Sequence, residues 1–114
     1  MRLLVQLDVI KVRVLYRENE QGRIENVYTV KVKNKDQIEH RYLIEARGIE
    51  GLVFEGKHEV TAAAGEILSI PVELSIDPEK LPSSANKIFF RVRAIDNPDI
   101  TKEADSRFIG PSIR

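Results

Sequence analysis

Apolar and polar residues alternate one by one along five separate stretches of this sequence. The clearest stretch holds Tyr28, Val30 and Val32, which are separated by Thr29 and Lys31. The apolar members of the other four stretches are Leu3, Val5, Leu7 and Val9; Tyr42, Ile44 and Ala46; Leu68, Ile70, Val72, Leu74 and Ile76; and Ile88, Phe90, Val92 and Ala94. A period of two places apolar side chains on one face of a β-strand, and no window keeps the spacing of an amphipathic helix. The chain is therefore predicted to be all-β.

The choice of apolar residues favours the same fold class. Valine and isoleucine together number 24, against 9 leucines and 7 alanines. β-Branched side chains lose rotamer freedom in helices and pack well on pleated sheets. A length of 114 residues suits one domain, and 42% hydrophobic with 32% charged residues is typical of a globular protein. We expect a single domain over residues 1–114.

Turn-forming residues separate the expected strands at intervals of about ten residues. This pattern predicts an immunoglobulin-like antiparallel β-sandwich of about seven or eight strands, with a small closed barrel as the alternative. Asp77 is suited to cap a single helical turn that starts at Pro78. Pro71 falls inside an expected strand, where it cannot donate a ladder hydrogen bond, so we expect a sheet edge or a bulge there.

The last two expected strands flank the loop Asn97-Pro98-Asp99. If Asp96 faces Ile100 across this loop, the register of the whole hairpin follows. The predicted pairs are Asp96–Ile100, Arg93–Glu103, Val92–Ala104, Arg91–Asp105, Phe90–Ser106 and Ile88–Phe108. Opposite charges at directly paired sites stabilise two strands by about 0.2–1 kcal/mol per pair. A slip by two residues would keep both faces of the hairpin, so the register is most open to that error.

The core has to be built without cysteine or tryptophan, because the sequence contains neither. The expected core aromatics are Tyr28, Tyr42, Phe54, Phe90 and Phe108. A buried tyrosine needs a hydrogen-bond partner for its hydroxyl. Tyr16 is the tyrosine that we place off the core.

No group of residues points to catalysis, to a cofactor or to a metal ion. The lack of cysteine excludes disulfides, a cysteine nucleophile and iron–sulfur ligation within this chain. The two histidines, His40 and His58, lack convergent ligand residues in the sequence and are interpreted as solvated side chains. The glycines are isolated, so no phosphate-binding loop is predicted. We therefore expect no catalytic, cofactor-binding or metal-ligating residue.

The charge pattern argues for a contact module. The 18 basic and 18 acidic residues cancel, and a nucleic-acid partner is not expected because such binding needs a basic footprint. Lys31, Lys33 and Lys35 line one face and are interpreted as a solubilising outer face, while Arg41 and Arg47 are placed on another sheet. The lack of tryptophan argues against a sugar-binding platform. A structural or protein-contact role remains.

No apolar run approaches the roughly 20 residues that a membrane helix requires, and residues 1–6 are too short for a signal peptide. The chain is therefore not expected to insert into a membrane by itself. Either the protein is cytosolic, or it is a piece of a longer protein whose targeting part lies elsewhere.

Five short motifs occur in a fixed order along the chain: LDVI (residues 7–10), LYRE (15–18), GRIENVY (22–28), NKDQ (34–37) and DSRFIGP (105–111). Together they resemble the C-terminal domain of FixG/RdxA/CcoG-type proteins, the cytochrome c oxidase accessory proteins. The resemblance extends from about residue 7 to residue 111, almost the whole chain. Within these motifs Asn26, Tyr28 and Arg107 are interpreted as architectural residues.

The resemblance implies an immunoglobulin-like domain that, in the family, follows transmembrane helices and a ferredoxin-like portion with two four-iron clusters. It implies an extracytoplasmic domain, on the periplasmic side of the bacterial inner membrane, of a larger membrane-anchored protein. The family supports assembly of cbb-type cytochrome oxidase, with a proposed role in copper reduction.

These implications set the expectations for partners and cofactors. We expect protein partners in oxidase assembly. The cluster-binding cysteines are absent, so no cofactor and no redox role are carried over to this domain, with copper a candidate substrate of the parent protein. The alternative is a free-standing adhesin-like or ligand-binding sandwich.

Overall fold

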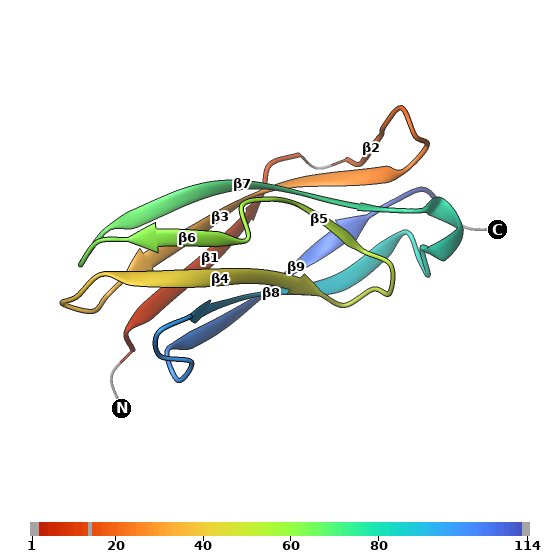
Figure 1. Cartoon of the computed structure of the whole chain (residues 1–114). Helices are drawn as coiled ribbons and strands as arrows, with labels where there is room; N and C mark the ends of the chain where they lie inside the picture. Colours follow the sequence, from red (N-terminus) through yellow and green to blue (C-terminus); the bar gives the residue numbers. More distant parts are fainter. Residues whose placement is uncertain (1–2, 14, 113–114) are drawn as a thin grey trace.

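Short strands make up most of the chain (Figure 1). The computed structural model describes residues 3–13 and 15–112. The strands are β1 (Val5–Lys11), β2 (Arg17–Glu18), β3 (Ile24–Asn34), β4 (His40–Arg47), β5 (Val53–Gly56), β6 (Glu59–Ala62), β7 (Ile67–Ile76), β8 (Ala85–Ala94) and β9 (Thr101–Ile109). The predicted helical turn is present as a 3-10 turn over Pro78–Lys80, where the Asp77 carboxylate accepts the Glu79 N–H at 3.0 Å. The described part of the chain contains no helix that is long and apolar enough to cross a membrane.

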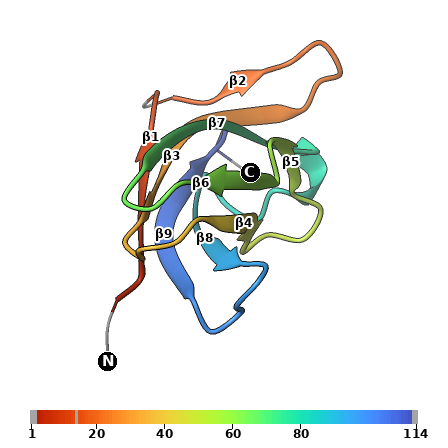
Figure 2. The same cartoon turned by 60° about the vertical axis from the view of Figure 1, so that its left-hand side comes forward.

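The strands form two antiparallel sheets that pack face to face (Figures 1 and 2). The first sheet has the order β1-β3-β7-β5, with β2 paired to β3, and the second has the order β6-β4-β8-β9. The molecule is elongated, with principal extents of 51 × 26 × 21 Å. The prediction of a β-sandwich, and not a closed barrel, is confirmed, although the described residues form nine strands where seven or eight were predicted.

The core lies between the sheets and is built from the alternating residues of the long strands. Tyr28, Tyr42, Phe90 and Phe108 are fully buried, as predicted, and the rings of Tyr28 and Phe90 meet edge to face at 5.1 Å. Phe54 is only half-buried, contrary to the prediction, because it lies on β5, the edge strand of the first sheet. The buried core consists of Val5, Leu7, Ile24, Tyr28, Val30, Val32, Tyr42, Ile44, Ala62, Ile70, Val72, Leu74, Ile76, Leu81, Ile88, Phe90, Val92, Ala94, Ile100 and Phe108.

Pro71 lies on a stretch of β7 that has a neighbour on one side. It is opposite Thr29 of β3, but β5 ends at Gly56, which is opposite Val72. The side of Pro71 that faces away from β3 is therefore a sheet edge, as predicted. The missing N–H of proline costs the ladder nothing at such a position.

The β8–β9 hairpin forms as predicted, but its register differs from the prediction by two residues. Ala94, and not Asp96, lies opposite Ile100, and the Ala94 N–H donates to the Ile100 carbonyl at 2.9 Å. Arg93 consequently faces Thr101. The predicted set of pairs is therefore wrong, although the two faces of the hairpin are kept.

The reason for the shift is a contact with another strand. The Ile95 N–H donates to the Arg41 carbonyl of β4 at 2.8 Å, so this residue continues the β4–β8 ladder and cannot take part in the turn of the hairpin. Asp96 turns away from the hairpin, and the turn is closed by the Ile100 N–H, which donates to the Asn97 carbonyl at 2.9 Å. A long-range backbone pairing thus overrides the shortest local loop.

The charged side chains of this sheet also pair differently from the prediction. Arg91 is opposite Glu103, yet it donates to Glu45 on β4 at 2.8 Å. Glu103 in turn accepts a hydrogen bond from Arg47 of β4 at 2.8 Å. Arg91 and Glu103 are therefore both bound to residues of the central strand β4 and not to each other.

Two polar side chains of β3 cross the core and bind the backbone of β9 in the other sheet. The Asn26 amide donates to the Ile109 carbonyl at 2.8 Å and accepts the Ile109 N–H at 2.9 Å. The Tyr28 hydroxyl donates to the Arg107 carbonyl at 2.7 Å. The predicted architectural role of these residues is confirmed, and Arg107 takes part through its backbone.

We predict that Asn26→Ala lowers the free energy of unfolding by about 2–4 kcal/mol, because it removes two hydrogen bonds and leaves partly buried backbone groups without partners. Tyr28→Phe deletes one hydroxyl group and should cost about 1 kcal/mol. Urea denaturation of both variants measures the difference. A loss below about 0.5 kcal/mol for Asn26→Ala would contradict the role assigned to these bonds.

Candidate functional site

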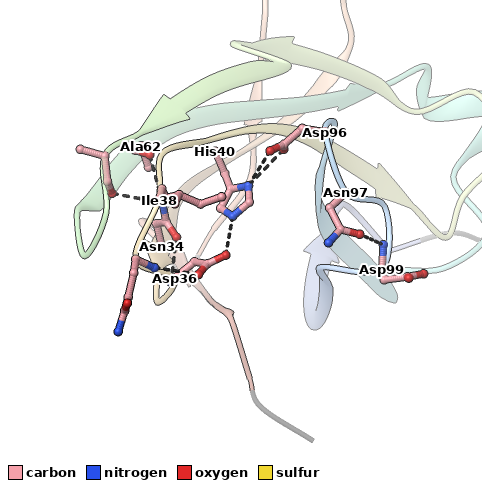
Figure 3. Close-up of polar contacts among 10 residues, drawn as sticks. Asn34, Asp36, Ile38, His40, Ala62, Asp96, Asn97 and Asp99 are labelled. Carbon is pink, nitrogen blue, oxygen red and sulfur yellow. Dashed lines mark hydrogen bonds and ion pairs between the residues drawn. The ribbon is translucent and has the colours of Figure 1, made fainter.

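His40 is buried at the start of β4, with 2% of its surface exposed, and is held between two carboxylates (Figure 3). Its Nδ1 lies 2.9 Å from an Asp96 oxygen, and its Nε2 lies 2.8 Å from an Asp36 oxygen. The prediction of a solvated His40 is therefore wrong. The signal for burial is in the sequence, since His40 is in phase with Tyr42 and with the core face of the strand.

The turn between β3 and β4 brings Asp36 to the imidazole. Asn34, the last residue of β3, is fully buried, and its side-chain oxygen accepts the Asp36 N–H at 3.0 Å. Its amide group donates to the Ile38 carbonyl at 2.8 Å and to the Ala62 carbonyl at 3.1 Å (Figure 3). One asparagine thus shapes the turn and attaches it to β6.

Asp96 comes from the loop between β8 and β9, which lies next to the same end of the sandwich (Figure 3). The Ile95 bond to β4 places this residue at the imidazole, and the Asn97 side chain accepts the Asp99 N–H at 3.3 Å within the same loop. His40 therefore joins two loops that are far apart in the sequence. Neither aspartate was predicted as a partner of His40. Asp36 reaches it through the local fold of the turn, and Asp96 reaches it only through the pairing of β4 with β8.

The geometry favours a protonated imidazole. A neutral imidazole carries one N–H, whereas two carboxylates that accept from both nitrogens need two. Burial lowers the pKa of His40, but the hydrogen bonds to Asp36 and Asp96 and their negative charges outweigh burial and hold this pKa above its ordinary value. The hydrogen bond from His40 lowers the pKa of Asp96. The cluster is therefore a charged clamp between the two loops.

We predict that this clamp makes stability depend on pH. Because the pKa of His40 is raised in the folded state, the stabilisation is complete below the ordinary value of 6.5 and is lost as the pH rises through the folded-state pKa. His40→Asn should therefore lower the free energy of unfolding more at about pH 5.5 than at about pH 8.5. Urea denaturation of both chains at the two pH values measures this.

His58→Asn is the matched control, because it removes an imidazole from an exposed position. In this control the additional stabilisation that His40 provides at the lower pH should remain. An equal effect of His40→Asn at both pH values would contradict the charged clamp.

The second histidine is exposed, as predicted. The rings of His58 and Phe54 pack against each other at 4.5 Å.

The Tyr42 hydroxyl is buried and finds no hydrogen-bond partner among the residues that the structure describes. Burial, followed by the charges of Asp36 and Asp96, raises the pKa of Tyr42 to about 12. The expected partner for each buried tyrosine is thus found for Tyr28 but not for Tyr42.

The described residues contain no group of three or more histidine, cysteine, aspartate or glutamate side chains that could hold a metal ion. At His40 both ring nitrogens are already bound to carboxylates.

We predict that calorimetric titration with Cu(I), Cu(II) or Zn(II) detects no specific binding, because no free imidazole nitrogen of His40 is left to converge with other ligands. Micromolar binding that is lost in His40→Ala or His58→Ala would overturn this prediction.

The five basic residues singled out in the sequence lie on or next to strands β3 and β4. Lys31 and Lys33 lie on β3 and Lys35 follows it, with Lys31 and Lys35 exposed and Lys33 half-buried. Arg41 and Arg47 lie on β4 of the second sheet, as predicted, and bind Glu59 at 3.2 Å and Glu103 at 2.8 Å.

The chain is similar to one known family along most of its length. A family model described as "IG-like fold at C-terminal of FixG, putative oxidoreductase" matches residues 1–111. The crystal structure of a FixG-related protein from Vibrio parahaemolyticus superposes with a TM-score of 0.85 at 34% sequence identity, and covers 93% of this chain and 95% of its own. The search of curated proteins found no match.

Proposed function

The chain belongs to the family of immunoglobulin-like domains at the C-terminus of FixG, and from this premise we propose that it is a non-catalytic contact domain of a FixG-type protein. The domain would be on the periplasmic side of the bacterial inner membrane as part of a membrane-anchored protein. Its role would be to bind proteins that take part in the assembly and copper maturation of cbb-type cytochrome oxidase.

The hydrogen bonds of the buried polar side chains are the observation that supports this proposal. Asn26, Tyr28, Asn34 and His40 direct their hydrogen bonds to backbone groups and to carboxylates inside the domain. They stiffen the sandwich and its loops, and they have no free group aimed at a substrate. A rigid sandwich that presents loops and strand edges to other proteins is a common use of this fold.

The donor set of the chain does not fit an iron–sulfur cluster. Such clusters are held by cysteine thiolates, and the sequence has no cysteine. Electron transfer in the parent protein would therefore belong to its other parts, and the domain would contribute recognition.

Deletion of residues 7–111 from the parent protein tests the proposal in the natural host. We expect impaired assembly and lower activity of the oxidase, because the contact surface is lost, while the iron–sulfur content of the remaining protein stays the same. Oxidase activity of the membranes and iron content of the purified parent are the two measurements. Unchanged oxidase activity would count against the proposal, and a loss of iron would show that the domain stabilises the cluster-bearing part instead.

A further inference from the structure

The first half of β7 has an open edge, which we define as the side of Ile67–Pro71 that faces away from β3. In this half β7 pairs with β3, whereas β5 covers the other side only from Val72 to Ser75. After Gly56 the chain leaves this sheet and enters β6 of the other sheet. Open edges of this kind accept an additional strand.

The phase of the backbone determines which groups the open edge offers. An added Cβ at Gly56 would lie 3.0 Å from the Pro71 carbonyl oxygen, so this carbonyl points to the β5 side of β7. Backbone groups in a strand alternate in direction, so Ser69 and Ile67 point the same way as Pro71. The open edge thus offers the N–H groups and the carbonyls of Ile67 and Ser69, while the Pro71 carbonyl lies at the end of the β5 ladder.

A hollow of about 590 Å³ lies beside the open edge and is lined by residues of β6 and β7. The half-buried Val60 and Leu68 and the buried Ile70 supply apolar walls. A strand added to the open edge would direct every second side chain into this hollow. The full lining is Gly56, Lys57, Glu59, Val60, Thr61, Leu68, Ser69, Ile70 and Pro71.

The charges around the open edge favour a partner with carboxylates. Lys33 is opposite Ile67 and Lys31 is opposite Ser69 on β3, and Lys57 lies at the rim of the hollow. None of these three lysines forms an ion pair with another residue that the structure describes.

Three acidic residues also lie nearby, and one of them, Asp8 of β1, is directly opposite Lys31. Glu59 binds Arg41 at 3.2 Å, and the Glu66 carboxylate accepts the Ala63 N–H at 2.8 Å. A carboxylate of an incoming strand would compete with Asp8 for Lys31, whereas Lys33 is opposite the uncharged Gln6 and has no such competitor in the ladder.

We propose that the open edge of β7 binds an extended segment of a partner protein by strand addition. The segment carries apolar residues at alternate positions, which enter the hollow, and acidic residues at the positions between them. These acidic residues lie on the outer face of the sheet, the face of Lys31 and Lys33, which are on the far side of β7. Pro71 withholds one N–H and so limits pairing to a short segment. This inference rests on the proposed contact function, since it locates the surface that makes the contact.

The probe is a seven-residue peptide with blocked ends, in which valines alternate with aspartate and glutamate. It is titrated into the 15N-labelled 114-residue chain up to about 1 mM and followed by the amide signals in NMR spectra. We expect the largest shifts at Ile67 and Ser69. A peptide with lysines in place of the acidic residues, and one with N-methylated backbone amides, should each bind at least about tenfold more weakly.

Ser69→Pro is the decisive variant, with Ser69→Ala as its matched control. Ser69→Pro removes one N–H of the open edge, and it should fold because Pro71 already occupies the same phase of the strand. It should bind the peptide about five- to tenfold more weakly, whereas Ser69→Ala should bind like the unmodified chain. Equal binding to both variants, shifts on another surface, or no binding at 1 mM would each overturn the inference.

A second copy of the chain is the competing occupant. If sedimentation shows a dimer that Ser69→Pro abolishes, the edge is a homodimer surface and the inference of a peptide partner is wrong. Failure of this inference is distinguishable from failure of the contact function. If deletion of residues 7–111 impairs the oxidase but Ser69→Pro in the parent does not, the contact function stands and the open edge is not its site.

Discussion

The hydrogen bonds from β3 across the core to β9 hold the two sheets of this domain together in one arrangement. Apolar contacts between sheets tolerate sliding, because burial has little directional preference. The Asn26 amide pairs with both backbone groups of Ile109, and such a pair has one register. Tyr28 adds a bond to the Arg107 carbonyl. In a chain without cysteine these polar contacts fix what a disulfide between sheets often fixes in related sandwiches.

The opposite end of the sandwich is fixed by charge. His40 binds Asp36 and Asp96 and thereby connects the β3–β4 turn to the β8–β9 loop, while Asn34 attaches that turn to β6. Both ends of β3 are thus anchored, one to the last strand and the other to the loops. The first half of β7 pairs on one side only and has a hollow beside it, and this is why we assign the contact with a partner to that edge.

Sequence periodicity predicted the sandwich and most of its core, because both depend on which face of a strand a residue occupies. The missing N–H of Pro71 predicted the sheet edge there. Periodicity did not predict the hairpin register, which depends on the bond from Ile95 to β4. It also missed the burial of His40. A histidine among charged neighbours looks solvated in a sequence, and its two aspartate partners come from turns that only the folded sheets bring together. The partial exposure of Phe54 was missed because the sequence of β5 does not show that this strand lies at the edge of its sheet.

Native-state hydrogen exchange on the isolated chain tests most directly the claim of a scaffold that is locked across its core and open along the first half of β7. The Ile109 amide is near the end of the last strand, where amides usually exchange through local fraying. We predict that it exchanges as slowly as the amide of Val30 in the centre of β3, while the Ser69 amide exchanges rapidly. Rapid exchange at Ile109 would contradict the cross-sheet lock, and slow exchange at Ser69 would contradict the open edge.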